Sequence, residues 1–243
     1  MSGVDLGSVD LSNMFFLLEG EEGVDTNSLL ASKINQLGLM LQTGNGVPKD
    51  EKKAIELYQR ATDMGFAEAM VNLGLCYQFG VGVSQNDEKA IELFVRAADL
   101  GNSDAMNDLG CCYSLGRGVR EDKKKAVEFF QRGADCNNPK AINNLGECYM
   151  HGIGIGEDKQ KAVMLFRRAS QMGYADSTFN LGMCYQFGFG ISKDAKKAVI
   201  LYRRAMEAGN TDAIPYLAEC YLKGIGVPAN RKKAAELYRM VRE

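Results

Sequence analysis

A single spacing of 36 residues organises most of the chain. A Leu-Gly pair recurs at this interval, and the series is Leu37-Gly38, Leu73-Gly74, Leu109-Gly110, Leu145-Gly146 and Leu181-Gly182, continued by Leu217-Ala218. A Lys-Ala step follows the same interval at Ala54, Ala90, Ala126, Ala162, Ala198 and Ala234. A period of this length is typical of solenoids, in which each repeat contacts only its neighbours. We therefore expect one elongated repeat domain, because repeats of this kind build no closed globular core.

Each repeat contains two helical patterns. Residues 67–102 begin with small or apolar residues three and four positions apart, which predicts a first helix, the A helix, ending near Gly80. A second helix, the B helix, follows an Asp or Asn that suits an N-cap, and these residues are Asp50, Asn86, Asp122, Asp158, Asp194 and Asn230. Gly74 lies inside the A helix and predicts a close approach of the B helix at that point.

The predicted fold class is all-α, a right-handed α/α superhelical solenoid of six 36-residue helix-turn-helix repeats. We place the repeats near 31–66, 67–102, 103–138, 139–174, 175–210 and 211–243, within a solenoid spanning 27–243. Residues 1–26 do not match the repeat and are acidic, with one apolar run from Met14 to Leu18. Two interpretations of this segment stay open: a flexible tail that caps the first repeat, or a short binding motif for a partner.

The charge and hydropathy exclude several classes of function. The net charge is -2, so the chain as a whole lacks the basic excess by which proteins bind nucleic acids or anionic lipids. Apolar runs stay shorter than a membrane span, and the first residues lack the basic start of a secretory signal. We therefore expect a cytoplasmic protein with no nucleic-acid partner and no membrane insertion.

Seven cysteines do not predict a disulfide framework. Five of them occupy one repeat position, 36 residues apart, and these are Cys76, Cys112, Cys148, Cys184 and Cys220. Equivalent positions in successive repeats are separated by a helical hairpin, whereas a disulfide needs Cα atoms within about 7 Å. We interpret them as small buried residues in a reducing compartment. A bridge between Cys112 and Cys136 inside one repeat is the alternative.

These residues give the pattern A-x-x-x-L-G-x-C-Y-x-x-G-x-G-V, then D-x-x-K-A-x-x-L-[FY]-x-x-A-A-x-x-G. The pattern resembles the Sel-1-like repeat family, a relative of the tetratricopeptide repeats, over about residues 28–243. Ala218 and Asn137 depart from it, each replacing a glycine. The resemblance implies a superhelical scaffold that binds other proteins along the concave side, which the A helices line. Its members serve as adaptors in endoplasmic-reticulum quality control, in chitin-synthase regulation and in bacterial signalling or host interaction.

An enzymatic function has little support in the sequence. A cysteine-rich bacterial branch of the family is associated with β-lactam binding, so a thiol-dependent or β-lactam-hydrolysing enzyme is the alternative from another class. The sequence has no Ser-x-x-Lys, and its single histidine, His151, lies at a variable position. Phosphate-binding and zinc-binding spacings are also missing from the sequence. We expect no cofactor and no metal.

The variable positions of the A helices point to a partner. Positions five and two before the repeat leucine, and two and five after it, share one helix face, which we call the A face. Its apolar members predict packing between repeats or a peptide groove, and its acids complement helix dipoles or attract basic residues. Asn72, Asn144 and Asn180 form a further row, with hydrogen bonds expected inside their own repeat or to a partner. The predicted partner-binding residues are Glu68, Val71, Asn72, Leu75, Gln78, Asp104, Asn107, Cys111, Asn143, Glu147, Met150, Phe179, Met183 and Gln186.

The predicted function is a non-enzymatic scaffold that holds a protein or peptide with apolar anchors and some basic residues. Self-association is the alternative within the same class, through the apolar residues Leu237, Tyr238 and Val241 of the last helix.

Overall fold

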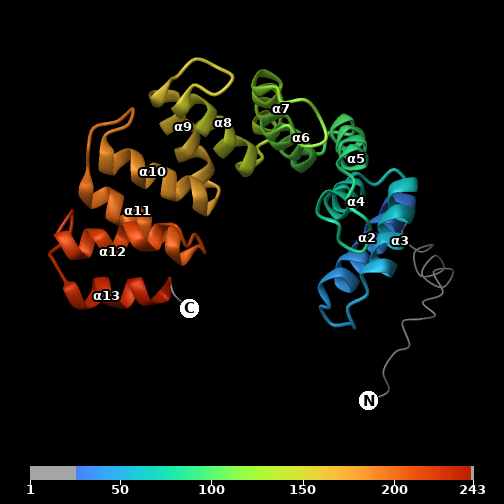
Figure 1. Cartoon of the computed structure of the whole chain (residues 1–243), viewed down its shortest axis with the longest axis horizontal. Helices are drawn as coiled ribbons and strands as arrows, with labels where there is room; N and C mark the ends of the chain where they lie inside the picture. The colour runs from blue at the N-terminus through green and yellow to red at the C-terminus, as the bar shows by residue number, and fades with distance from the viewer. Residues whose placement is uncertain (1–25, 242–243) are drawn as a thin grey trace. The chain divides into compact units, whose positions relative to one another are not determined.

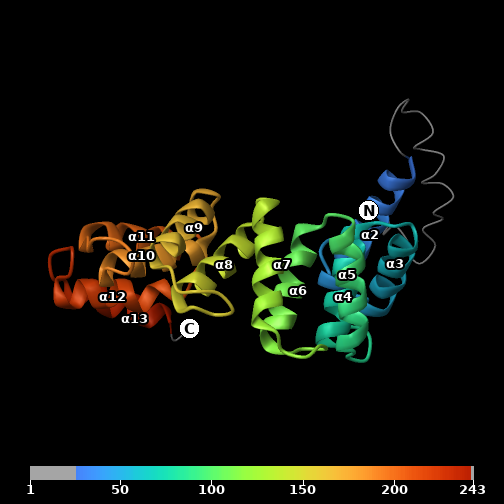
Figure 2. The same cartoon turned by 90° about the horizontal axis from the view of Figure 1, so that it is seen from above.

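The computed structural model describes residues 26–241, and every regular element in that range is an α-helix (Figures 1 and 2). The A helices are α2 (Thr26–Thr43), α4 (Ala67–Phe79), α6 (Ser103–Leu115), α8 (Pro139–His151), α10 (Ala175–Phe187) and α12 (Ala213–Lys223). The B helices are α3 (Glu51–Asp63), α5 (Asp87–Asp99), α7 (Lys123–Asp135), α9 (Lys159–Gln171), α11 (Ala195–Glu207) and α13 (Arg231–Met240). The predicted all-α helix-turn-helix repeats are confirmed. Of the predicted segment 1–26, only Thr26 belongs to the described residues.

The helices belong to two compact units. Unit 1 ends at Asn102 and contains α2 to α5, and unit 2 begins at Ser103 and contains α6 to α13. Within each unit an A helix packs against the B helix of its own repeat. The helices α4, α8, α10 and α12 also pack against the B helix that precedes them in the chain. This alternation is what a helical repeat array requires, since each hairpin buries its apolar side only against the next.

The B helices start as predicted. The side chain of each Asp or Asn N-cap accepts a hydrogen bond from the amide three residues later, for example Asp50 from Lys53 at 3.0 Å and Asn86 from Lys89 at 2.8 Å. The same bond recurs at Asp122, Asp158, Asp194 and Asn230. Each cap stabilises its helix by about 1 kcal/mol. The first five B helices are followed by a residue with positive φ, which is Asn137 at 59° after α7 and glycine after the other four.

Glycine after the repeat leucine accommodates an aromatic ring of the B helix. A Cβ atom at Gly74 would lie 2.6 Å from the Phe94 ring, and one at Gly182 would lie 2.7 Å from the Tyr202 ring. Gly38, Gly110 and Gly146 face a ring of their own B helix in the same way. This close approach explains why a helix interior tolerates glycine, which there costs about 1 kcal/mol relative to alanine.

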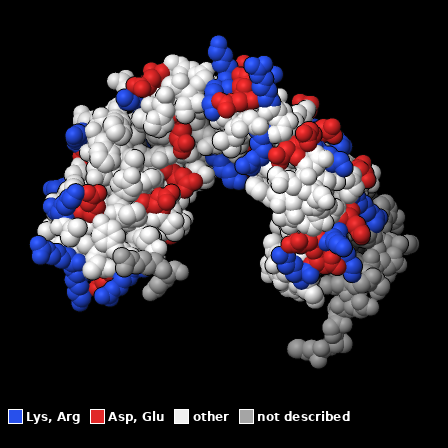
Figure 3. Space-filling view, in the orientation of Figure 1, with Lys and Arg blue, Asp and Glu red and all other residues white. Residues whose placement is uncertain are grey.

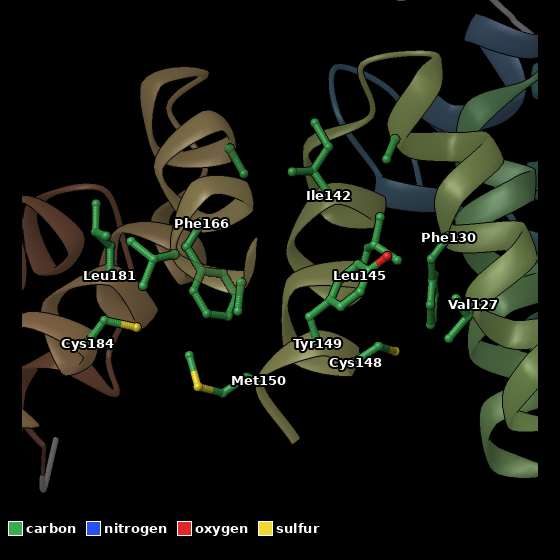
Figure 4. Packing of buried hydrophobic residues seen from close by; sticks show 14 of the residues in the cluster. Val127, Phe130, Ile142, Leu145, Cys148, Tyr149, Met150, Phe166, Leu181 and Cys184 are labelled. Atoms are coloured by element: carbon green, nitrogen blue, oxygen red, sulfur yellow. The ribbon is translucent and has the colours of Figure 1, made fainter. Parts of the chain in front are cut away.

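The core of unit 2 runs through successive repeats. Phe130 and Phe166 are 4% and 2% exposed, and Ile142, Leu145 and Leu181 are buried with them. Figure 4 shows these side chains reaching from α7, α8, α9 and α10 into one continuous interior. Cys148 and Cys184 belong to the same interior, so the predicted burial of these cysteines is confirmed.

Candidate partner-binding site

The A face is less open than the sequence predicted. Five of the predicted partner-binding residues are buried: Val71, Gln78, Asn107, Asn143 and Met150. These positions do not face solvent, because A helices of neighbouring repeats pack along this flank, as α6 does against α8 and α2 against α4. For the apolar Val71 this agrees with packing between repeats, one of the two interpretations of the A face. Glu68, Asp104 and Glu147 are exposed, and Asn72, Leu75, Cys111, Phe179, Met183 and Gln186 are half-buried.

A row of asparagines joins successive repeats. Asn72 Nδ2 donates to Asn35 Oδ1 at 2.9 Å, and Asn144 Nδ2 donates to Asn107 Oδ1 at 2.8 Å. The two residues of each pair are 37 positions apart in the sequence. Asn180 Nδ2 donates to Asn143 Oδ1 at 3.0 Å. The expectation that these asparagines bond inside their own repeat is therefore wrong, and a bond from them to a partner stays a prediction. In each pair the donor comes directly before the repeat leucine of its own A helix. The acceptor comes two residues before the repeat leucine of the preceding A helix, so the hydrogen bond joins the two A helices.

Glu147 is fixed by this row. Its Oε1 accepts hydrogen bonds from Asn143 Nδ2 at 2.9 Å and from Asn180 Nδ2 at 3.2 Å. Asn143 Oδ1 in turn accepts from the Ser177 hydroxyl at 2.7 Å. The Glu147 side chain is nevertheless exposed, so a carboxylate on α8 is presented to solvent while two amides from two repeats hold it.

Asp108 stands at the position where the next two repeats carry Asn144 and Asn180. Asn107 Nδ2 donates to Asp108 Oδ1 at 3.3 Å. Burial raises the pKa of Asp108 to about 6, against the lowering effects of that hydrogen bond and of Lys140. Asp108 was not among the predicted partner-binding residues, although an acid in a row of asparagines was the signal that could have found it.

The acids in the first turns of α6 and α10 also connect repeats. Asp104 accepts a hydrogen bond from Asn138 Nδ2 at 3.1 Å, and Asp176 accepts one from Asn210 Nδ2 at 2.7 Å. Lys140 Nζ lies 3.6 Å from Asp104 Oδ1. These carboxylates therefore stabilise the start of the following repeat as well as their own helix end.

Aromatic rings replace the asparagine row near the last repeat. Phe179 and Tyr216 occupy the two row positions, and their ring centroids lie 5.1 Å apart in an edge-on arrangement. The fully buried Tyr202 packs against both rings and donates its hydroxyl to Gln186 Oε1 at 2.5 Å. Tyr58 donates to Gln42 at 2.7 Å in the same way. Phe179 and Gln186 thus contribute to packing between and within repeats.

The residue two after the repeat leucine stays accessible in every repeat of unit 2. We call this set, Cys111, Glu147, Met183 and Glu219, the central row; Glu147 is exposed and the other three are half-buried. Sulfur-containing side chains alternate with carboxylates along it. The A helices of unit 2 contain five acids, and their two lysines are both paired, Lys140 with Asp104 and Lys223 with Glu219.

The charges of unit 2 are segregated between its A and B helices. The B helices α7, α9, α11 and α13 contain sixteen lysines and arginines against four acids. On the face seen in Figure 3, basic side chains gather over α13. A basic segment is therefore attracted to the A side of this unit and an acidic one to the B side.

The groups that could support catalysis are dispersed. None of the seven cysteines forms a disulfide, which is contrary to the alternative of a bridge between Cys112 and Cys136. Burial raises the pKa of Cys76, Cys111, Cys148, Cys184 and Cys220 to about 11. His151 is exposed at the end of α8. Among residues 26–241 no group of three or more His, Cys, Asp or Glu could hold a metal ion, and no helix there is long and apolar enough to cross a membrane.

Paired helices repeated every 36 residues, with glycine under an aromatic ring in the first five pairs, define a tetratricopeptide-like α solenoid. The Sel1 repeat family model matches residues 34–66, 67–102, 103–138, 139–174, 175–210 and 212–240. The chain therefore belongs to the Sel1 repeat family, as the sequence pattern predicted. Solenoids of this class commonly serve as protein-interaction scaffolds, because their stacked repeats present extended surfaces.

Solved structures support the same fold. A Sel1 repeat protein from Oxalobacter formigenes is 34% identical, with 87% of each chain covered and a TM-score of 0.82. The protective antigen c5321 of uropathogenic Escherichia coli is 25% identical with a TM-score of 0.72, and 96% of this chain matches 52% of that one. The immunity protein Pa5087 from Pseudomonas aeruginosa shares the fold at 22% identity, with coverage of 87% and 81% and a TM-score of 0.63. The comparison with curated proteins gives no match.

Proposed function

We propose that the chain is a non-enzymatic scaffold that holds a partner peptide along the central row of unit 2. The observation that carries the proposal is the row itself, in which Cys111, Glu147, Met183 and Glu219 occupy one position in four consecutive repeats and remain accessible. Apolar contacts alternate there with carboxylates. A partner that carries apolar and basic side chains in the same alternation would satisfy both.

The spacing of the repeats specifies the partner further. Packed helices lie about 8–10 Å apart, and an extended peptide advances about 3.3 Å per residue. Three peptide residues therefore span one repeat. We expect a partner segment in which every third residue contacts the row, and in which these contact residues are alternately apolar and Lys or Arg. The segment can run in either direction.

The site is organised before the partner arrives. Asn143 and Asn180 hold the Glu147 carboxylate, so little side-chain entropy is lost when it binds a cation. The two lysines of these A helices are already paired with Asp104 and Glu219, which reduces their repulsion of a basic partner.

The other predicted residues divide into two groups. We retain Glu68, Asn72 and Leu75 as proposed contacts on α4, and Asp104, Phe179 and Gln186 beside the central row, because all six reach the surface. Val71, Gln78, Asn107, Asn143 and Met150 are buried, and we propose that they act by supporting that surface. The proposal includes no catalytic step, since five of the seven thiols are held far above their usual pKa. We also propose a reducing, cytoplasmic location, because none of the seven cysteines forms a disulfide.

A random peptide display selection against the full chain tests the proposal. Selected peptides should carry the alternating apolar and basic pattern. Glu147→Gln combined with Glu219→Gln should weaken their binding about tenfold, which is about 1.4 kcal/mol, measured by fluorescence anisotropy. Glutamine keeps an acceptor for Asn143 and Asn180, so the fold of α8 and α10 should persist in circular dichroism.

The matched control is Glu128→Gln combined with Glu236→Gln, which removes the same charge from exposed positions of α7 and α13. This control should bind the peptides as the wild type does. Equal losses in both variants would mean that net charge and not the central row determines binding, and the proposal would then be wrong.

Self-association through the last helix is a second candidate function. Tyr238, Met240 and Val241 are 39%, 55% and 54% exposed, whereas Leu237 is buried in the core of unit 2. Leu237 is therefore removed from the predicted interface. Light scattering of the full chain over a range of concentrations measures whether the remaining residues join two copies.

A further inference from the structure

The last three B helices, α9, α11 and α13, contain twelve lysines and arginines against two acids. Some of these cations stabilise the repeats. Lys161 Nζ lies 4.2 Å from the centre of the Tyr149 ring, and Lys197 and Lys233 make the same contact with a tyrosine at 5.4 and 4.7 Å. These three lysines therefore belong to the packing of their own helix pairs.

Other cations form one stripe along the outside of the same helices. The second, sixth and ninth residues of each B helix lie opposite its buried side, and they are exposed in every repeat of unit 2. On α9, α11 and α13 this stripe carries five cations: Arg167, Lys196, Arg203, Lys232 and Arg239. Within the described residues, Arg167, Lys196 and Lys232 form no ion pair. Their charges are thus available to an outside partner.

Two exposed apolar side chains lie among these cations. Met164 on α9 is 67% exposed and Ile200 on α11 is 55% exposed. Both occupy the sixth position of their helix, where the other four B helices carry glutamate: Glu56, Glu92, Glu128 and Glu236. Two consecutive repeats have therefore lost an acid and gained an apolar side chain at the same position. We call Met164, Arg167, Lys196, Ile200, Arg203 and Lys232 the outer patch.

The B helices of unit 1 have another character. Its α3 and α5 contain seven acids against five lysines and arginines. The outer patch is thus a property of particular repeats and does not follow from the family pattern. The net charge of -2 averages over these differences, so it conceals a basic surface that is confined to part of unit 2.

The outer patch projects from the surface, since Met164 and Ile200 each keep more than half of their area exposed. Clefts of about 790 and 780 Å³ lie near Lys49 and near Arg120, and neither is lined by a residue of the outer patch. A protein segment binds its apolar anchors in pockets, and a nucleic-acid backbone binds cations but leaves aliphatic side chains in water. An anionic bilayer suits both groups, because its headgroups attract cations and its acyl boundary accepts projecting apolar side chains.

We propose that the outer patch binds the surface of an anionic lipid bilayer. Met164 and Ile200 enter the boundary between headgroups and acyl chains, and the cations beside them bind the phosphates and carboxylates of the headgroups. The contact is peripheral, with α9 and α11 remaining folded on the membrane surface. It does not depend on the proposed scaffold function, because the central row belongs to the A helices.

Sedimentation of the full chain with lipid vesicles tests this contact. At about 0.15 M salt we expect binding to phosphatidylcholine vesicles that contain about 30% phosphatidylserine, and at least tenfold weaker binding to pure phosphatidylcholine. Raising the salt concentration should weaken the binding, because it screens the cations of the patch from the headgroups.

A variant without the two apolar side chains separates lipid binding from general attraction of charge. Met164→Gln combined with Ile200→Gln keeps the net charge and should weaken vesicle binding at least tenfold. The fold should persist in circular dichroism, because four other B helices carry a polar residue at this position. The matched control is Leu115→Gln combined with Leu222→Gln, which removes side chains that are 64% and 43% exposed from A helices of unit 2. This control should bind vesicles as the wild type does.

A second pair of variants tests the cations. Changing Arg167, Lys196 and Lys232 to Gln should also weaken vesicle binding at least tenfold. The control changes three exposed cations on helices of unit 1 to Gln and so removes the same charge: Lys33, Lys52 and Arg96. It should leave vesicle binding unchanged.

Three results would overturn the proposal. The first is equal binding to the two kinds of vesicle. The second is a loss of binding in either control that matches the loss in its patch variant. The third is a chain that ignores both vesicles and uses the outer patch to bind a short DNA duplex or polyglutamate, since the surface would then serve a nucleic acid or an acidic protein.

Discussion

Asp108 shows how one residue can oppose the fold of its own repeat. It lies beside Asn107 in a partly buried position, and burial raises its pKa to about 6. The carboxyl group of an unfolded chain titrates near pH 3.9. Below about pH 4 the group is protonated in both states, and above pH 6 it is ionised in both. Stability is therefore lost as the pH rises from about 4 to 6, and it stays lower at neutral pH.

Asp108→Asn should stabilise the protein at pH 8 by about 1–3 kcal/mol and have little effect at pH 4. The asparagine amide oxygen can accept the Asn107 hydrogen bond without carrying a charge. Urea unfolding followed by circular dichroism at both pH values measures the difference. Asp99→Asn at an exposed position serves as the control, and a gain from Asp108→Asn that is equal at pH 4 and pH 8 would contradict the electrostatic cause.

At the scale of the helix pair, the distance between A and B helices depends on the glycine after the repeat leucine. Gly182→Ala should destabilise the protein by about 1–3 kcal/mol, because its Cβ would lie 2.7 Å from the fully buried Tyr202 ring. The urea midpoint of the full chain measures the loss. Gly156→Ala is the control, since that Cβ would meet nothing within 4 Å and its φ is not positive. A midpoint unchanged by Gly182→Ala would show that the helices can separate without cost.

The elements could be predicted from the sequence because each has a local cause. Asp50 and its equivalents cap the B helices, and Gly74 and its equivalents leave room for an aromatic ring of the B helix. Both residue types recur with the 36-residue period, so both features can be predicted from the sequence. The A face could not be predicted to the same extent. Whether Asn143 or Val71 meets solvent depends on the neighbouring A helix, and the asparagine pairs are 37 residues apart where the repeat is 36. Comparing the same position in successive repeats does not reveal these hydrogen bonds, because donor and acceptor are at adjacent positions of the repeat.

At the scale of the whole molecule, the thiols should report at once on the folding of the five repeats that begin at residue 67, because each of them contains cysteine. With a pKa of about 11, Cys76, Cys111, Cys148, Cys184 and Cys220 carry less than about one thiolate in a thousand at pH 7.5. Cys136 is exposed. A disulfide reagent should therefore give one fast thiol per chain in native buffer and seven in denaturant, by absorbance.

Cys136→Ser provides the control for this titration, because it should abolish the fast phase and leave the slow one. A second fast thiol in that variant would identify an activated cysteine and would reopen the thiol-dependent alternative.

The asparagine bonds between repeats also bear on how such an array can lengthen. A bond needs a donor in one repeat and an acceptor in the preceding one, so a copied repeat keeps its junction only if it contains both. Among the six repeats only the one at 139–174 has asparagine at the two positions, Asn143 and Asn144. A tandem copy of that repeat would join to itself through the bond it already makes with its neighbours. The repeat at 175–210, with Phe179 and Asn180, would place an amide against an aromatic ring. Residues 139–174 are therefore the natural unit for extending this protein by duplication or by design.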